Sequence, residues 1–175
     1  MAKPYSVWII GPACAGKTTL AQLFVDKLKN VGRPCIILDS PQVRDLFDSQ
    51  LGYDTVSRRK QTARMKRLAK LISMQDVLSV VALIHPFEDD RVNCRKDVPG
   101  YFEVFLKCDM EELIRRDTKK LYLPALRGKK RNVIGIDIPF DEPRNPDLII
   151  ESDRLNPGEM LDVLWRRYEE EIQSG

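Results

Sequence analysis

A glycine-rich loop between an apolar run and a helix-like segment constrains this chain more than any other feature. The residues of Gly11–Thr18 read Gly-Pro-Ala-Cys-Ala-Gly-Lys-Thr, follow the apolar run Val7–Ile10 and precede the helix-like segment Leu20–Leu28. This is the G-x-x-x-x-G-K-[ST] phosphate loop in the strand–loop–helix setting that it requires. A glycine-rich turn that only joined a strand to a helix would need neither Lys17 nor Thr18. The sequence therefore predicts a protein that binds a nucleotide.

The chemistry of the loop assigns a role to its positions. Glycines at both ends let the backbone N–H groups wrap a polyphosphate, and the following helix directs the positive end of its dipole at the anion. Lys17 is expected to reach the outer phosphates of ATP, and Thr18 to ligate Mg²⁺. The candidate ATP-binding residues are Gly11, Pro12, Ala13, Cys14, Ala15, Gly16, Lys17, Thr18 and Thr19.

Length and composition exclude several other classes. A chain of 175 residues fits one α/β domain, so we expect a single domain over residues 1–175. No apolar stretch of the sequence approaches the roughly 18 residues of a membrane span, and Met1–Tyr5 does not resemble a signal peptide. A net charge of +3 is too weak to indicate nucleic acid. We therefore expect a cytoplasmic protein that binds neither a membrane nor nucleic acid.

The spacing of the cysteines bears on metal sites and disulfides. The four cysteines have no C-x-x-C spacing and no neighbouring histidines, which argues against a zinc site and against a disulfide framework. They are expected to be free thiols, and they are Cys14, Cys35, Cys94 and Cys108.

Apolar runs alternate with helical patterns along the chain. The predicted strands are Val7–Ile10, Cys35–Leu38, Val77–Ile84, Tyr101–Lys107 and Leu148–Ile150. Continuous apolar runs of this kind are typical of parallel strands covered on both faces. The predicted helices are Leu20–Leu28, Pro41–Phe47, Arg58–Ser73, Glu111–Asp117 and a final segment with an apolar face from Met160 to Ile172. This order predicts a doubly wound α/β fold, a parallel five-stranded sheet flanked by helices, with ligands at the carboxyl ends of the strands.

Asp39 directly follows the second predicted strand, so the sheet topology would bring it beside the phosphate loop. A carboxylate there would hold the metal ion or take the proton of an acceptor hydroxyl. The alternative is a helix N-cap at Asp39 or Ser40 for the segment that begins at Pro41. Lys17 and Asp39 are thus the candidate catalytic residues, and Thr18 and Asp39 the candidate metal ligands.

Several further segments resemble the adenylylsulfate kinase family, nearly from end to end. The matching segments are Gly11–Thr19, Leu38-Asp39 with Arg44, Leu51–Tyr53 with Arg58, Ile84–Phe87 with Asp90-Arg91, Phe102–Phe105, Arg116-Asp117 with Leu121-Tyr122, Asn132 with Gly135–Asp137, Glu142-Pro143, and Asn145–Leu148. The resemblance implies the P-loop fold of nucleotide kinases, often dimeric. It also implies transfer of the γ-phosphoryl group of MgATP to the 3′-hydroxyl of adenosine 5′-phosphosulfate.

The same resemblance implies an acceptor site. Arg44 and Arg58 would hold the phosphosulfate, for which planar guanidinium forks are suited. Tyr53 would offer its ring to the adenine, and Arg116 would belong to a lid-like segment around residues 115–140 that covers ATP. Asn132 would begin the loop that closes the acceptor pocket. The further acceptor-binding candidates are Gln61, His85, Pro86, Phe87, Val133, Ile134 and Gly135.

Three of these residues also have a purely structural interpretation. Arg58 begins a basic run in which most side chains must simply solvate a helix face. Tyr53 could equally be a partly buried packing residue. His85 is the single histidine of the chain, and a lone histidine is more often a satisfied structural group than a ligand.

The acceptor side departs from the family pattern. Asp39-Ser40-Pro41 stands in place of Asp-Gly-Asp, and Val133 in place of an aromatic residue. The loss of that ring removes base stacking worth roughly 1–3 kcal/mol. Further differences are Gln61 for asparagine, His85 for serine, Glu88 for a basic residue, and Leu123-Pro124 for two lysines. The alternatives are therefore a kinase for adenylylsulfate, a kinase for a different nucleotide-linked anion, or a catalytically silent nucleotide-binding protein.

Overall fold

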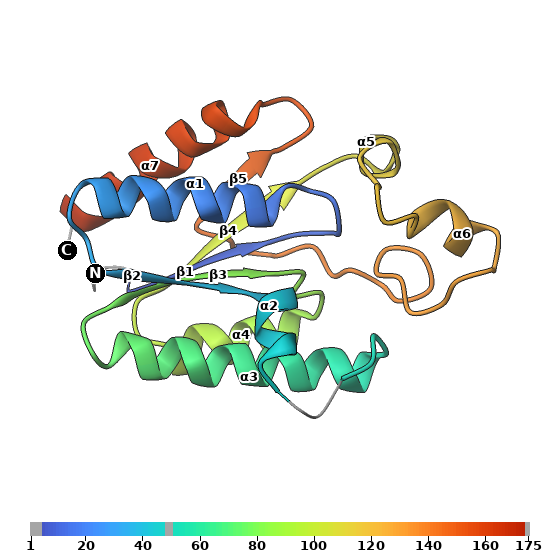
Figure 1. The fold of residues 1–175 in the computed structure, drawn as a ribbon, viewed down its shortest axis with the longest axis horizontal. Coiled ribbons are helices and arrows are strands. Elements are labelled where there is room, and N and C mark those ends of the chain that lie inside the picture. Colours follow the sequence, from blue (N-terminus) through green and yellow to red (C-terminus); the bar gives the residue numbers. More distant parts are fainter. Residues whose placement is uncertain (1–4, 48–50, 174–175) are drawn as a thin grey trace.

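The computed structural model describes residues 5–47 and 51–173, and in it five parallel strands lie between two layers of helices (Figure 1). The strands are β1 Ser6–Ile10, β2 Cys35–Asp39, β3 Leu78–Leu83, β4 Tyr101–Lys107 and β5 Leu148–Glu151. They pair in the order β2-β3-β1-β4-β5, and every pair is parallel. The predicted doubly wound five-stranded sheet is confirmed.

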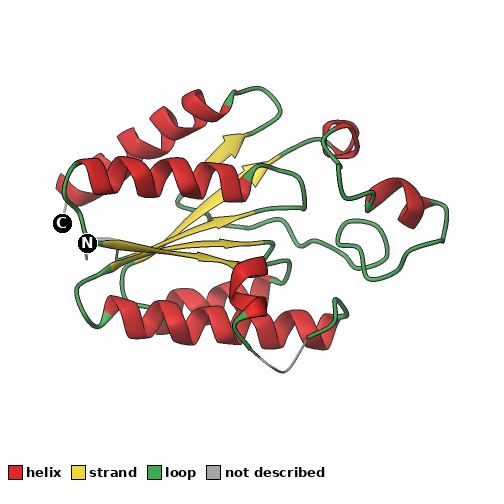
Figure 2. Ribbon diagram, viewed as in Figure 1, coloured by secondary structure: helices red, strands yellow, loops and turns green. Residues whose placement is uncertain are grey.

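Helices cover both faces of this sheet, as Figure 2 shows in red. Helices α1 (Lys17–Asn30) and α7 (Pro157–Gln173) lie on one face, and α3 (Thr55–Ser73) and α4 (Glu88–Asp97) lie on the other. Helix α2 (Ser40–Asp45) follows β2 directly. The short helices α5 (Met110–Arg115) and α6 (Tyr122–Leu126) lie beyond the carboxyl ends of the strands. Within the described ranges, no helix has the length and apolar character to cross a membrane.

The two faces of β1 explain its continuous apolar run. Successive side chains of a strand point to opposite faces, so Val7 and Ile9 enter the core under α1 and α7. Trp8 and Ile10 enter the second core, which is closed by residues of α3 and α4. Because both faces are buried, the strand has no polar alternation.

Helix α4 was not predicted, because it has no apolar stripe. It reads Glu-Asp-Asp-Arg-Val-Asn-Cys-Arg-Lys-Asp, and the residues that it buries are Arg91 and Cys94. Its first turn is acidic and its last turn is basic, which suits the helix dipole and is the signal that could have found it. Helix α6 was missed for a different reason, since its five residues are too short for periodicity to show.

Helix α3 begins three residues earlier than the basic run suggested, at Thr55. The carboxylate of Asp54 accepts the N–H of Ser57 at 3.0 Å. A side-chain acceptor of this kind satisfies one of the unpaired N–H groups of the first turn. The cap therefore fixes where α3 starts and places Arg58 in its first turns.

Candidate functional site

The phosphate loop turns sharply between β1 and α1. Gly11 has a φ of 145° and Gly16 a φ of 95°, values that favour glycine. A Cβ atom on Gly11 would lie 2.6 Å from the carbonyl oxygen of Leu106 on β4, so the close approach requires glycine. The first helical hydrogen bond of α1 runs from the N–H of Leu20 to the carbonyl of Gly16 (3.0 Å). The N–H groups of the preceding turn are thus available to an anion at the positive end of the helix.

Lys17, Thr18 and Asp39 meet at the carboxyl ends of β1 and β2. Lys17 Nζ donates to the carbonyl oxygen of Pro12 at 2.6 Å, and Thr18 Oγ1 donates to Asp39 Oδ2 at 3.0 Å. Burial lowers the pKa of Lys17 to about 8 and raises the pKa of Asp39. Asp39 occupies the N-cap position of α2, but its side chain makes no capping hydrogen bond within the described part of that helix. The carboxylate therefore faces the phosphate loop.

The segment after α5 supports the phosphate loop from the other side. Tyr122 is fully buried, and its hydroxyl donates to the carbonyl oxygen of Ala13 at 2.9 Å. Asp117 Oδ2 accepts the N–H groups of Leu121 (2.5 Å) and Tyr122 (2.8 Å). Asp117 Oδ1 lies 3.8 Å from the Sγ of Cys14, a loop residue with a φ of 66°. Two adjacent residues of the loop, Ala13 and Cys14, are thus fixed by this segment.

Removal of the Tyr122 hydroxyl should loosen the phosphate loop. Tyr122→Phe leaves the carbonyl of the partly buried Ala13 without its donor, a loss of about 0.5–1.5 kcal/mol. We expect the KM for ATP to rise about 3- to 10-fold, measured by steady-state kinetics with varied ATP. Tyr168→Phe is the matched control, because the hydroxyl of that α7 tyrosine has no hydrogen-bond partner among the described residues. An equal rise in both variants would contradict the assignment.

A pocket of about 400 Å³ lies beside the loop. The residues that line it are Cys14, Gly16, Thr19, Arg116, Leu155, Asn156, Pro157 and Met160. The guanidinium of Arg116 is oriented by Glu112 Oε1 at 2.5 Å and by the carbonyl oxygen of Ser152 at 2.8 Å. The structure therefore brings Arg116 beside the phosphate loop.

The pocket residues at the start of α7 were not predicted as site residues from the sequence. Asn156 Oδ1 accepts the N–H groups of Gly158 (2.9 Å) and Glu159 (3.1 Å), and Glu159 Oε2 accepts the N–H of Asn156 (2.8 Å). This reciprocal pattern is a capping box, and Pro157 suits the first helical position. These signals are readable in the sequence, but they predict a helix start and not a pocket.

Four acceptor-side candidates lie together. The guanidinium groups of Arg44 and Arg58 lie 4.8 and 5.6 Å from the centroid of the Tyr53 ring. Arg58 donates to the carbonyl oxygens of Tyr53 (2.7 Å) and Asn132 (2.8 Å), and Arg44 donates to that of Leu51 (2.9 Å). Burial, followed by repulsion from Arg44, lowers the pKa of Arg58.

In the part of the chain that the structure describes, neither arginine forms a direct ion pair with a carboxylate. Two neighbouring cations that donate hydrogen bonds to main-chain carbonyls make a positively charged site. Planar guanidinium groups in such a site are suited to a tetrahedral oxyanion.

The loop that follows Asn132 packs against the turn after β3. Phe87, Ile134 and Ile138 form one buried apolar cluster, and the carboxylate of Asp137 accepts the N–H groups of Asn132 and Val133, each at 2.6 Å. Gly135 has a φ of 86°, and its N–H donates to the carbonyl of Ile138 at 2.7 Å. Of the candidates Pro86, Phe87, Val133, Ile134 and Gly135, the structure therefore packs Phe87 and Ile134 on each other, whereas the side chain of Val133 enters the core under α1 and α7.

Gln61 and His85 are buried. Gln61 Nε2 donates to the carbonyl oxygen of Ser40 at 3.2 Å. The His85 ring lies 5.3 Å from the Trp8 ring, on the side of the sheet covered by α3 and α4, and burial lowers its pKa to about 3. Neither ring nitrogen has a hydrogen-bond partner among the described residues. The burial agrees with a structural role for His85, although the described residues provide no hydrogen-bond partner for its ring nitrogens.

Known proteins resemble this chain in sequence over most of its length. The sequence pattern of the family described as adenylylsulphate kinase matches residues 3–151. A probable adenylyl-sulfate kinase of Pyrococcus abyssi is 34% identical over 166 residues, which are 95% of this chain and 95% of the relative. A cytidine diphosphoramidate kinase of Campylobacter jejuni is 34% identical over 164 residues, which are 94% of this chain and 96% of the relative.

Solved structures of known proteins share this fold. The APS kinase CysC of Mycobacterium tuberculosis, in complex with AMPPNP and APS, matches with a TM-score of 0.81 at 29% identity, over 94% of this chain and 99% of that chain. The shikimate kinase of Aquifex aeolicus matches with a TM-score of 0.61 at 16% identity, over 97% and 99% of the two chains. The second match extends the shared fold to other kinases of small molecules.

Proposed function

Since this chain belongs to the adenylylsulphate kinase family and is a phosphotransferase, we propose that it transfers the γ-phosphoryl group of ATP to the 3′-hydroxyl of adenosine 5′-phosphosulfate. The observation that carries the acceptor assignment is the pair Arg44 and Arg58. Both guanidinium groups lie over the Tyr53 ring, and together they suit an anion with several oxygens, such as a phosphosulfate.

On the donor side, Lys17 and the N–H groups of the phosphate loop would bind the phosphates of ATP, and the pocket beside Arg116 would receive its base. We assign residues 115–140 as a lid over the nucleotide. The oxygens of Thr18 and Asp39 fit Mg²⁺, which prefers a few protein oxygens together with phosphate oxygens. When bound there, the ion would neutralise charge on the β- and γ-phosphates.

In the transfer, the acceptor hydroxyl oxygen forms a bond to the γ-phosphorus while the bond from that phosphorus to the oxygen of the departing ADP breaks. The hydroxyl proton passes to the carboxylate of Asp39. In the ion-free protein burial raises the pKa of Asp39, which favours proton acceptance, whereas a bound Mg²⁺ would lower that pKa. Phosphoryl transfer depends chiefly on positioning and charge neutralisation, so one modest base is sufficient.

A second acceptor, cytidine diphosphoramidate, is favoured by a specific observation. Val133 stands where the family pattern has an aromatic residue, and its side chain is buried in the core. One stacking surface for a purine is thus missing. The relative named for that acceptor also equals the Pyrococcus relative in identity to this chain.

The proposal is tested by ADP release from MgATP with adenosine 5′-phosphosulfate, with cytidine diphosphoramidate and with no acceptor. The product mass should show one added phosphate. Turnover that depends on the first acceptor supports the proposal, and turnover with the second alone replaces it with the second candidate. ATP binding without ADP release for either acceptor would contradict both kinase assignments and favour the silent alternative.

The role of Arg58 can be separated from that of its helix. Arg58→Ala removes a charged donor worth about 1.5–3 kcal/mol, so we expect the KM for the acceptor to rise about 10- to 100-fold with an unchanged KM for ATP. Arg67→Ala is the control, because Arg67 lies exposed on the same helix. A matching loss of ATP affinity in Arg58→Ala would argue against an acceptor role.

A further inference from the structure

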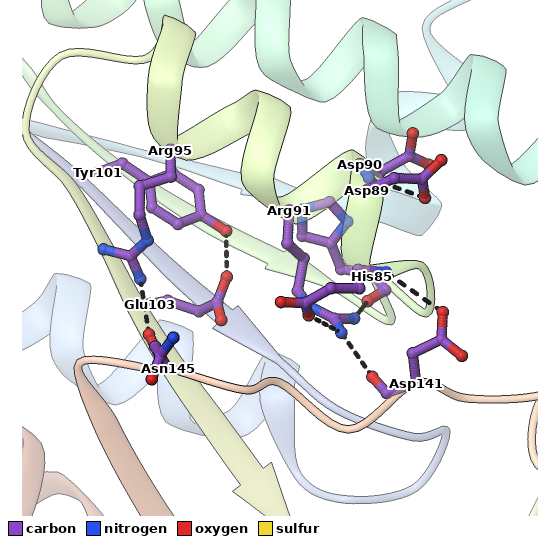
Figure 3. A network of polar contacts seen from close by, with 10 residues as sticks. His85, Asp89, Asp90, Arg91, Arg95, Tyr101, Glu103, Asp141 and Asn145 are labelled. Carbon is purple, nitrogen blue, oxygen red and sulfur yellow. Dashed lines mark hydrogen bonds and ion pairs between the residues drawn. The ribbon is translucent and has the colours of Figure 1, made fainter.

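A buried arginine outside the residues assigned above joins two parts of the acceptor side. Arg91 lies on α4 and is 3% exposed, and Figure 3 shows its guanidinium among groups from three segments. We propose that Arg91 is a positioning residue, which holds the acceptor loop, residues 132–138, against the turn after β3. The proposal rests on the proposed function, because it names what fixes the acceptor side of that same site.

Each segment that Arg91 contacts supplies an oxygen. Nη1 donates to the carbonyl oxygen of His85 at 2.7 Å, and Nη2 donates to the carbonyl oxygen of Asp141 at 2.6 Å. Nε and Nη2 donate to Glu88 Oε2 at 3.1 and 2.5 Å. A planar fork with several fixed donors can join three groups in this way, and the single ammonium of a lysine cannot do so with the same geometry.

The contact with Asp141 reaches the acceptor loop through a short stretch of chain. The N–H of Asp141 donates to the carbonyl of Pro86 at 2.9 Å, and Asp141 Oδ2 accepts the N–H of Glu88 at 3.3 Å. The N–H of Asp141 therefore bonds the chain just after the loop to the turn, and its carbonyl and carboxylate oxygens bond it to α4. Figure 3 shows Asp141 directly beside Arg91 and the turn.

The turn itself carries an acceptor-side candidate. His85 has a φ of 53°, a left-handed conformation that is uncommon for a residue with a side chain. Its carbonyl is the group that Arg91 Nη1 binds. This hydrogen bond stabilises the conformation that presents Phe87 to Ile134 and Ile138, so displacement of the guanidinium would shift the apolar cluster as well as the chain after it.

Glu88 makes the arrangement particular to this chain. It supplies the negative charge opposite the buried guanidinium, at a position that is basic in the family pattern. A buried charge without its partner is unfavourable, so the Glu88–Arg91 pair acts as one unit, and its geometry sets the separation between α4 and the chain after the acceptor loop.

The test compares Arg91→Ala with Arg95→Ala. Arg95 lies one turn further along α4 and forms its ion pair with Asp147 (2.8 Å). It is a matched arginine, because its hydrogen bonds go to Asn145 and Asp147 and not to Asp141. We expect Arg91→Ala to raise the KM for adenosine 5′-phosphosulfate about 10-fold or more, with an unchanged KM for ATP. Arg95→Ala should change neither value.

Chemical rescue adds a readout that a loss of folding would not give. Arg91 and Glu88 line a hollow of about 330 Å³ that also reaches Arg95, so a small guanidinium compound can enter the space that the alanine leaves. Millimolar ethylguanidinium should lower the raised acceptor KM of Arg91→Ala and should not affect Arg95→Ala. A KM for ATP that rises with that of the acceptor, or an equal effect of both variants, would overturn the proposal.

Hydrogen exchange separates this proposal from the proposed function. In Arg91→Lys the N–H groups of Gly135 and Asp141 should exchange faster than in the unaltered protein, while those of α1 keep their rates. Unchanged exchange at both positions would contradict positioning, even if the enzyme is active. Absence of turnover in the unaltered protein would instead contradict the proposed function and leave this measurement valid.

Discussion

Replacement of Lys17 by alanine should lower the kcat for phosphoryl transfer by about 10³-fold or more. The ammonium group lies at the phosphate loop with its Nζ 2.6 Å from the carbonyl oxygen of Pro12, at the start of α1. Charge develops on the transferred group and on ADP, and a cation held in a half-buried site stabilises that charge more than one in water does. The measurement is the rate of acceptor-dependent ADP release at saturating MgATP.

A matched control variant and the pH dependence of activity test the role of Lys17 further. Lys29→Ala removes an exposed lysine from the far end of the same helix and should keep the activity of the unaltered protein. Because burial lowers the pKa of Lys17 to about 8, kcat/KM for ATP should fall as the pH rises above about 8, where Lys17 of the ligand-free protein loses its proton. Residual activity of Lys17→Ala within 10-fold of the unaltered protein would exclude Lys17 from the catalytic step.

The single histidine should make the protein less stable in mild acid. Burial lowers the pKa of His85 to about 3 in the fold, whereas an unfolded histidine has a pKa of about 6.5. As the pH falls from about 6.5 to about 3, the unfolded chain takes up a proton that the folded chain does not. Stability is therefore complete above about pH 6.5 and falls by about 1.4 kcal/mol for each pH unit below it.

His85→Asn tests this expectation, because asparagine does not titrate and tolerates the left-handed conformation. Between pH 6.5 and 4.5 the free energy of unfolding, measured with urea, should fall by about 2–3 kcal/mol more in the unaltered protein than in His85→Asn. Carboxylates such as Glu112, whose pKa the ion-paired Arg115 and Arg116 lower to about 2, affect both proteins alike. Parallel pH curves would show that His85 gains a partner or water in solution.

The sheet and the donor side were predictable because their signals are local. The apolar run of β1, the glycine spacing and Lys17 lie within one short stretch of sequence, and Asp39 follows from the rule that parallel strands end at one edge. The physical causes act locally: a strand buried on both faces favours apolar residues, and a phosphate cradle needs glycine where backbones approach closely.

The acceptor side was less predictable, because it depends on contacts between distant segments. The bond from Arg58 to the carbonyl of Asn132 leaves no mark on either residue type. His85 is buried and left-handed just after β3, and no local sequence pattern encodes that conformation. Arg91 lies in a helix without an apolar stripe, so neither periodicity nor composition distinguishes it from the solvated charges around it.

Main-chain carbonyl oxygens already accept hydrogen bonds from the cations at both ends of the site. Pro12 supplies the oxygen for Lys17, and Asn132 supplies one for Arg58. Substrate binding is therefore an exchange, in which a ligand oxygen replaces a protein oxygen and the net gain is the difference between two hydrogen bonds. Under the proposed assignment, the anion that binds Arg58 also releases Asn132, so that acceptor affinity and the closure of residues 132–138 are thermodynamically linked.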